Sequence, residues 1–282
     1  MRFGICTWVW ASPLRDAEVL AIAERVRGLG FDVLEVCVED PSLVSADVLT
    51  DARERTGIEY SVCGAFGPDR DLAHPDAGPR ANAAAYLDRL LELAAAIGSP
   101  HVCGPMYAAV GKEPAVDDEA RKVEWGRAVT GLEAAAERAE ALGVRLAIEP
   151  LNRFETDLVN TVEQGVAMCE DIGSPAAGLL LDTFHMNIEE KSIGAAIRAA
   201  GDRLVHVHAC ENDRGTLGTA HVPWPEVFDA LREIGYDRQV VIESFTPSVT
   251  TIARAVAMWR PLDATGDALA TAGLAFLRQS TA

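Results

Sequence analysis

The sequence predicts a (β/α)8 barrel, and three observations lead to that prediction. Short apolar runs alternate eight times with longer, Ala-rich stretches of helical periodicity. Strand-then-helix order is typical of a parallel sheet, and eight right-handed crossovers close such a sheet into a barrel. The length of 282 residues suits one such domain, since these barrels have about 250 residues. We therefore expect residues 1–282 to form a single domain.

The eight strands are expected at continuous apolar runs, as in a parallel sheet that is covered on both faces. In chain order they are 2–6 (RFGIC), 32–36 (DVLEV), 58–63 (IEYSVC), 101–104 (HVCG), 144–149 (VRLAIE), 178–182 (GLLLD), 204–208 (LVHVH) and 239–243 (QVVIE). A doubly wound open sheet has the same order of elements. It is disfavoured because no glycine-rich dinucleotide fingerprint follows the first strand.

The helices are expected between these strands, where apolar residues recur with helical spacing. In chain order they span 15–29, 45–56, 79–97, 115–142, 161–172, 190–200, 225–234 and 250–278. Several are followed by a glycine that can end a helix, namely Gly28 or Gly30, Gly57, Gly98, Gly143 and Gly235. The longest irregular segments are 64–78, 104–114 and 209–224. All three follow a strand, so we expect them at the catalytic end of the barrel.

The composition excludes several classes of function. The formal charge of −18 argues against nucleic acid or an anionic membrane as a partner. There is no apolar stretch of membrane-spanning length, and the N-terminus MRFGICTWVW fits a first strand better than a signal peptide. The six cysteines include no CxxC pair, which indicates reduced thiols in a cytoplasmic protein.

Four of the expected strands end in a side chain that can bind a metal, namely Glu149, Asp182, His208 and Glu243. Successive members are 33, 26 and 35 residues apart, which is about the length of one strand–helix unit. Any one acid could simply cap a helix. Three acids that converge with one imidazole at one end of a barrel need a compensating cation. Their oxygen and nitrogen donors suit Mn²⁺, Mg²⁺ or Co²⁺ better than a structural zinc.

Polar side chains also follow three of these strands, in the segments EPLNRFE, DTFHMN and HACENDR. They include the polar side chains of Asn152, Glu155, His185 and Arg214. Of these, Arg214 and His185 can donate to a hydroxyl or carbonyl oxygen of a substrate. Trp8 and Trp10 follow the first strand and could either stack on a sugar or pack in the core. His206 lies two residues before His208, on the same side of the strand but one layer deeper. We expect it to be a buried histidine whose hydrogen bonds are satisfied.

The motifs IEPLNRFETDLVNT (148–161), LDTFHMNIEE (181–190), HVHACENDR (206–214) and VIESF (242–246) resemble those of the ketose 3-epimerases. This is the D-tagatose 3-epimerase and D-allulose 3-epimerase group of the xylose-isomerase-like barrels. The resemblance extends from FGICTWVW to the last expected helix. The segment after Tyr107 has no clear match to an aromatic residue that some members place over the sugar.

The resemblance implies that one divalent metal ion is bound by Glu149, Asp182, His208 and Glu243. Glu149 and Glu243 would also form the acid/base pair. The residues in contact with the sugar would be Glu155, His185, Arg214 and Cys63. It further implies a homodimer or homotetramer that acts on a small-molecule sugar.

A ketose 3-epimerase must remove a proton from the carbon beside the carbonyl on one face and return it on the other. Two carboxylates on opposite sides of the substrate meet this requirement if one is ionised while the other is protonated. A divalent metal would stabilise the cis-enediolate formed between these steps. The sequence thus predicts inversion of C3 in a free ketose, such as D-tagatose, D-fructose, D-allulose or ribulose.

Four other functions fit parts of the pattern. An aldose–ketose, hydroxypyruvate or inosose-type isomerase would use the same metal but move the proton between C1 and C2. A phosphosugar epimerase needs a cationic cradle, and the strand-end loops offer only Arg153, Arg214 and the Lys112 region. A metal-dependent DNA-repair endonuclease is disfavoured by the acidic charge and the lack of further histidine ligands. A non-catalytic binding protein would not need two acids beside the metal.

Overall fold

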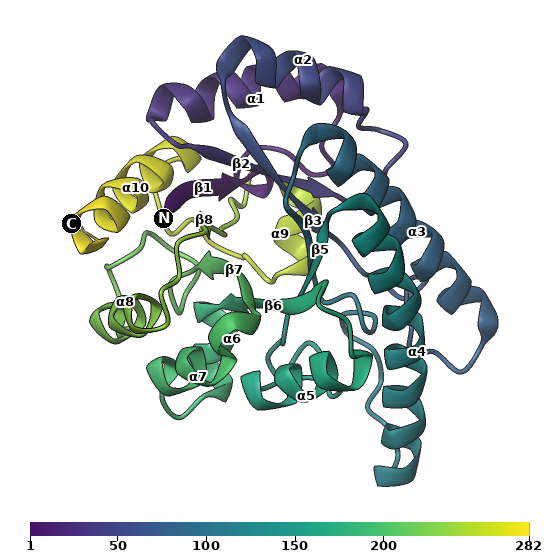
Figure 1. The fold of residues 1–282 in the computed structure, drawn as a ribbon. Coiled ribbons are helices and arrows are strands. Elements are labelled where there is room, and N and C mark those ends of the chain that lie inside the picture. The colour runs from purple at the N-terminus through teal and green to yellow at the C-terminus, as the bar shows by residue number, and fades with distance from the viewer. Residues whose placement is uncertain (282) are drawn as a thin grey trace.

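The computed structural model describes residues 1–281 and contains a closed barrel of eight parallel strands. Each strand pairs with the next in chain order, and β8 pairs with β1, so the sheet has no free edge. Most of the helices form an outer ring around the strands (Figure 1). The predicted fold class is confirmed.

The strands begin and end within two residues of their predicted bounds. They are β1 (Arg2–Cys6), β2 (Val33–Val38), β3 (Glu59–Gly64), β4 (His101–Gly104), β5 (Arg145–Ile148), β6 (Ala177–Asp182), β7 (Leu204–Ala209) and β8 (Gln239–Ile242). Every residue of β2, β4, β6, β7 and β8 is buried. This explains why the strands are continuous apolar runs: helices cover one face and the barrel interior the other.

The helices are α1 (Asp16–Leu29), α2 (Ala46–Thr56), α3 (Ala77–Ile97), α4 (Asp118–Leu142), α5 (Val162–Ile172), α6 (Thr183–Glu189), α7 (Ile193–Ala200), α8 (Trp224–Glu233), α9 (Thr250–Ala255) and α10 (Gly266–Thr281). Two short 3-10 turns are η1 (Thr7–Val9) and η2 (Gly201–Arg203). The first four helices end at left-handed glycines, namely Gly30, Gly57, Gly98 and Gly143. Gly28 lies inside α1, and Gly235 lies one residue beyond the cap of α8.

Two helical predictions were wrong in part. The range 250–278 contains two helices rather than one, and residues 256–265 separate them. Pro261 lies in this gap and cannot continue a helix, because it lacks an N–H group and its ring obstructs the preceding turn. A further helix, α6, begins directly after β6 and was not predicted from the sequence. There the Asp182 side chain accepts a hydrogen bond from Phe184 N at 2.7 Å and caps the helix.

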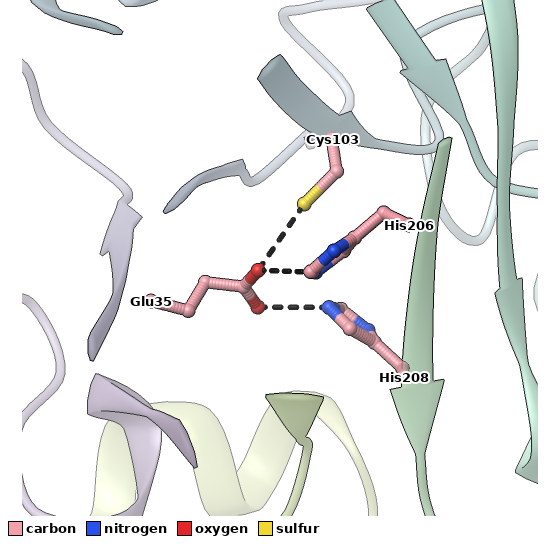
Figure 2. Close-up of side chains that lie close together, drawn as sticks. All are labelled: Glu35, Cys103, His206 and His208. Atoms are coloured by element: carbon pink, nitrogen blue, oxygen red, sulfur yellow. Dashed lines mark hydrogen bonds and ion pairs between the residues drawn. The ribbon is translucent and has the colours of Figure 1, made fainter. Parts of the chain in front are cut away.

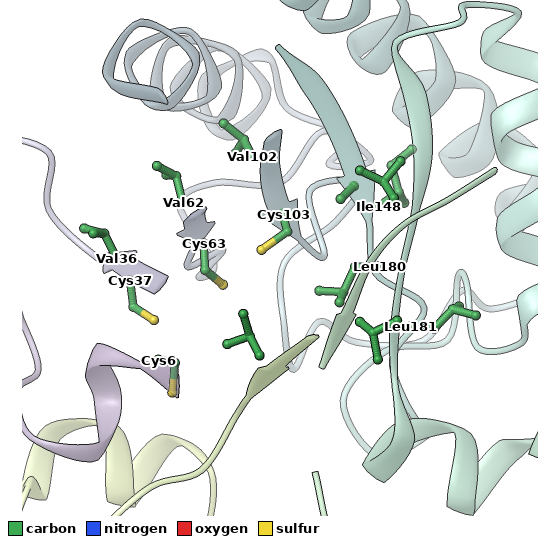
Figure 3. Packing of buried hydrophobic residues seen from close by; sticks show 14 of the residues in the cluster. Cys6, Val36, Cys37, Val62, Cys63, Val102, Cys103, Ile148, Leu180 and Leu181 are labelled. Atoms are coloured by element: carbon green, nitrogen blue, oxygen red, sulfur yellow. The ribbon is translucent and has the colours of Figure 1, made fainter. Parts of the chain in front are cut away.

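Each of the first four strands, β1 to β4, directs one thiol toward the barrel interior. Figure 3 shows the side chains of Cys6, Cys37, Cys63 and Cys103, from β1 to β4, directed toward the barrel interior. Val36, Val62 and Val102 alternate with them and face the surrounding helices. All six cysteines of the chain are free and buried, and burial raises the pKa of the Cys6 and Cys103 thiols well above the usual value. These side chains therefore fill the interior as neutral, weakly polar groups.

Within residues 1–281, none of the helices combines the length and the hydrophobicity that crossing a membrane requires.

Candidate active site

The four strand-end residues lie together at one end of the barrel. Glu149 follows β5, Asp182 ends β6, His208 lies in β7 and Glu243 follows β8. All four are buried, with at most 5% of the residue exposed. One potential ligand atom from each of Glu149, Asp182 and His208 lies within 4.8 Å of the others. Glu243 Oε1 is 3.5 Å from His208 Nδ1, so the fourth residue borders the same space.

Burial dominates the electrostatics of this cluster. It raises the pKa of Glu149 well above the usual value, and the nearby Glu243 raises it further. Burial also raises the pKa of Asp182 to about 7, although Arg214 opposes the shift. The Arg214 guanidinium donates to Asp182 Oδ2 at 2.9 Å and to Glu243 Oε2 at 2.5 Å. Three buried acids thus share one arginine, and two of them, Glu149 and Asp182, hold their protons more tightly than usual.

The orientation of His208 leaves one of its ring nitrogens open to a cation. Its Nε2 lies 2.8 Å from Glu35 Oε1, whereas its Nδ1 is buried and has no hydrogen-bond partner. Leaving a buried nitrogen unpaired costs about 1–3 kcal/mol, and a cation among the acids would remove that cost. Carboxylate oxygens and one imidazole nitrogen are a suitable donor set for a divalent ion such as Mn²⁺, Co²⁺ or Mg²⁺. The residues present therefore fit one metal ion.

A cavity of about 460 Å³ opens onto this cluster. Its volume lies in the range of small-molecule sites. Polar side chains that line it are Glu149, Glu155, His185, Arg214 and Glu243. Apolar side chains that line it include Trp8, Phe66, Leu151, Phe245 and Ile252. Cys63 also lines the cavity, so all of the predicted sugar contacts border the same space.

His185 and Glu155 are held by one asparagine. Asn152 N donates to His185 Nδ1 at 3.2 Å, and Asn152 Nδ2 donates to Glu155 Oε1 at 2.9 Å. Burial lowers the pKa of His185 well below the usual value, so the ring is neutral and carries its proton on Nε2. That nitrogen lies 3.6 Å from Glu149 Oε1 and can donate to an oxygen in the cavity.

Arg214 is fixed by aromatic rings as well as by acids. Its guanidinium lies 3.8 Å from the ring centre of Phe184 and 5.1 Å from that of Phe245. Its backbone φ of 68° is left-handed, a conformation that is uncommon for residues with a side chain. Such outliers often accompany functional side chains.

The two tryptophans near the N-terminus have different surroundings. Trp8 lines the cavity, donates from Nε1 to Glu39 Oε1 at 2.9 Å, and packs against Phe245. Trp10 instead donates to Asp267 at 2.9 Å and does not line the cavity. The sugar-stacking alternative therefore remains for Trp8 alone.

Glu35 is a central residue that the sequence analysis missed. It lies in the middle of β2, is fully buried, and contacts both His206 and His208. His206 is fully buried and makes a hydrogen bond through Nε2, as predicted, but its Nδ1 has no hydrogen-bond partner, so the prediction of a fully satisfied histidine was wrong in part. The only signal for Glu35 in the sequence is a charged residue in the apolar run VLEVCV.

Comparison with known proteins identifies the family. The profile of the xylose isomerase-like TIM barrel family matches residues 23–279. The L-ribulose 3-epimerase of Mesorhizobium japonicum is 34% identical over 98% of this chain and 93% of that protein. This chain belongs to the ketose 3-epimerase family of xylose isomerase-like TIM barrels. The D-psicose 3-epimerase of Agrobacterium fabrum is 35% identical over 95% of this chain and 93% of that protein.

A solved structure extends the agreement to three dimensions. The D-allulose 3-epimerase from Methylomonas sp. in complex with D-allulose matches with a TM-score of 0.93 at 29% identity. The alignment covers 99% of this chain and 97% of that one. The resemblance to the ketose 3-epimerases that was predicted from the motifs is confirmed. As a member of this family, the chain is an isomerase that acts on sugars.

Proposed function

We propose that this chain, folded as one domain, inverts C3 of a free ketose and uses one divalent cation for that reaction. The cation would be held by Glu149, Asp182, His208 and Glu243. The observation that carries the proposal is the pair of buried carboxylates, Glu149 and Glu243, at a sugar-sized cavity beside the unpaired Nδ1 of His208. Relatives named L-ribulose 3-epimerase and D-psicose 3-epimerase support both the reaction and a free ketose as substrate.

The acid/base roles follow from where the two carboxylates stand. Glu149 follows β5 and Glu243 follows β8, with β6 and β7 between them, so they reach the cavity from different sides. Burial raises the pKa of Glu149, so this carboxyl can keep a proton near neutral pH. Arg214 places a positive charge beside Glu243. One group can thus donate to one face of C3 while the other accepts from the opposite face, and the roles exchange with the direction of reaction.

The remaining cavity residues orient the substrate and hold its charge. Neutral His185 can donate its Nε2 proton to a substrate oxygen, and the fixed guanidinium of Arg214 can donate to a second. When bound, the divalent cation supplies Lewis-acid stabilisation of the negative charge that develops on the substrate oxygens, worth several kcal/mol. Trp8, Phe66 and Phe245 line the cavity with apolar surface, which keeps water away from the deprotonated sugar.

The distribution of cations favours a free ketose over a phosphorylated one. Arg214 is the only cationic side chain that lines the cavity within residues 1–281. Lys112 is paired with Glu124 and Asp157, and Arg153 is paired with Glu189. Lys112 and Arg153 are therefore not available to form a phosphate cradle together with Arg214.

The test is a screen of free ketoses with the protein stripped by EDTA and then supplied with Mn²⁺, Co²⁺ or Mg²⁺. We expect metal-dependent interconversion of C3 epimers, and NMR in D₂O should find deuterium at C3. Deuterium at C1 or C2 would instead identify an aldose–ketose isomerase. Activity that does not depend on metal would refute the proposed centre.

The acid/base assignment has its own test. Glu149→Gln should lower kcat by about 10²–10⁴-fold with metal bound, since the amide cannot transfer the proton. Glu137→Gln on the exposed face of α4 is the matched control and should leave kcat unchanged. Near-normal activity of Glu149→Gln with bound metal would show that the assignment is wrong.

A further inference from the structure

A further buried carboxylate lies beneath the proposed metal ligands and has no role in the mechanism above. Glu35, from β2, is 0% exposed. Its Oε1 lies 2.8 Å from His208 Nε2, and its Oε2 lies 2.8 Å from His206 Nε2 and 2.9 Å from Ser61 Oγ. Figure 2 shows Glu35 entering from one side of the barrel and the two histidines of β7 from the other. Both carboxylate oxygens are thus engaged by imidazoles.

This network is built from hydrogen bonds and is not a second metal site. Atoms of Glu35, Cys103, His206 and His208 do lie within 4.8 Å of one another. In a tetrahedral site with bonds of about 2.0–2.1 Å, however, ligand atoms would be about 3.3 Å apart. Both nitrogen–oxygen distances here are 2.8 Å, the spacing of a charge-assisted hydrogen bond. Each imidazole therefore directs an Nε2–H group at the carboxylate.

We propose that Glu35 is a positioning residue that holds His208 with its proton on Nε2 and its Nδ1 lone pair directed at the cation. The inference rests on the proposed function, because it takes His208 as a metal ligand. A neutral imidazole has one N–H group and one lone pair. The bond to Glu35 assigns the proton to Nε2, and the unpaired Nδ1 faces Glu243 at 3.5 Å. Carboxylate partners of this kind fix the tautomer and the ring plane of metal-binding histidines.

Two substitutions remove this support in different ways. In Glu35→Gln the amide offers one acceptor oxygen and one NH₂ group, whereas the two Nε2–H groups need two acceptors. One imidazole must then move its proton to Nδ1 or turn away. Glu35→Ala removes both acceptors. Ser61→Ala is the matched control, since it deletes a bond to Oε2 and leaves the contact between Glu35 Oε1 and His208 intact.

The first experiment is calorimetric titration of Mn²⁺ into EDTA-stripped wild type and these three variants. Loss of both acceptors should raise the Kd for Mn²⁺ by about 10–100-fold in Glu35→Ala, and Glu35→Gln, which keeps one acceptor, should lie between Glu35→Ala and the wild type. Ser61→Ala should remain within about threefold of the wild type. Wild-type affinity in a folded Glu35→Ala protein would overturn the role of Glu35 alone. A wild-type protein that binds no Mn²⁺, Co²⁺ or Mg²⁺ would instead refute the proposed metal centre, and the positioning role with it.

The second experiment needs no substitution and decides the matter if the variants do not fold. In ¹⁵N-histidine-labelled wild type stripped of metal and held at alkaline pH, where the imidazole is neutral, NMR reports which ring nitrogen carries the proton before any cation binds. We expect a protonated Nε2 and a proton-free Nδ1 at His208. A role of Glu35 in packing alone would not set this tautomer. A proton on Nδ1 of His208 would overturn the proposal.

Discussion

Replacing Asp182 by asparagine should stabilise the metal-free protein although it removes a proposed metal ligand. Asp182 is 1% exposed and lies in the same cluster as Glu149 and Glu243. Burial raises the pKa of its carboxyl from 3.8 to about 7. Asparagine is neutral at every pH, and its side-chain oxygen can still cap α6 at Phe184 N. The substitution therefore removes the cost of a buried charge and keeps the helix cap.

The size and sign of the effect follow from proton linkage. An unfolded chain ionises this carboxyl near pH 4, but the folded chain does so only near pH 7. Ionisation therefore costs stability as the pH rises from about 4 to about 7, and the cost levels off above that. A gap of about three pKa units corresponds to about 4 kcal/mol. This is an upper limit, because Glu149 can take up the proton and because the bond from Arg214 is lost.

We therefore expect Asp182→Asn to raise the free energy of unfolding by about 1–3 kcal/mol at pH 7.5 in EDTA. Urea denaturation at pH 7.5 and pH 4 measures it, and the two proteins should agree at pH 4. Asp117→Asn is the control, since Asp117 also caps a helix, at Ala120 N, but is exposed. It should change stability by less than about 0.5 kcal/mol. An Asp182→Asn protein no more stable than the wild type at pH 7.5 would refute the reasoning.

Two further predictions concern stability away from the cluster. Lys112→Met removes a nearly buried cation 2.5 Å from Asp157 and should cost about 1–3 kcal/mol in urea unfolding at neutral pH. Burial raises the pKa of Asp157, but contacts led by Lys112 lower it below the usual value. The loss of stability in Lys112→Met should therefore shrink as the pH falls below about 4. An unchanged urea midpoint at pH 7 would contradict this prediction. Gly178→Ala would place Cβ 2.3 Å from a Val205 methyl and should lower stability by about 1–3 kcal/mol. Gly126→Ala in α4 is the control: its Cβ meets nothing within 4 Å, so it should raise stability by about 1 kcal/mol. Equal shifts of the melting temperature in the two glycine variants would contradict both expectations.

The strands could be predicted from the sequence because their signal is local. Each is a continuous apolar run between a preceding glycine-capped or polar segment and a following loop, and that pattern repeats eight times. The signal failed where one residue serves two elements. Asp182 ends β6 and also caps α6, so the polar segment DTFHMN was interpreted as a loop. The Ala- and Leu-rich periodicity on both sides of Pro261 likewise suggested one helix where there are two.

The same distinction explains which site residues could be found. Side chains at strand ends meet at one end of a barrel whatever lies between them, so four of them could be proposed from spacing alone. Contacts through the barrel interior have no such rule. Glu35 is 171 and 173 residues from His206 and His208, and no periodicity links them. The apolar lining of the cavity is similarly dispersed, since Trp8, Phe66 and Ile252 come from three distant segments.

The bond between Glu35 and His208 joins the second strand to the seventh. It therefore affects the stage of folding at which the protein can bind the cation. A partly folded chain with only β5 to β8 in place would already carry all four strand-end side chains. It would still lack the carboxylate that orients His208, which arrives only when β2 closes the other half of the barrel. Tight binding of the cation would then be the last step of folding. A tightly bound metal ion would therefore indicate that the barrel is closed.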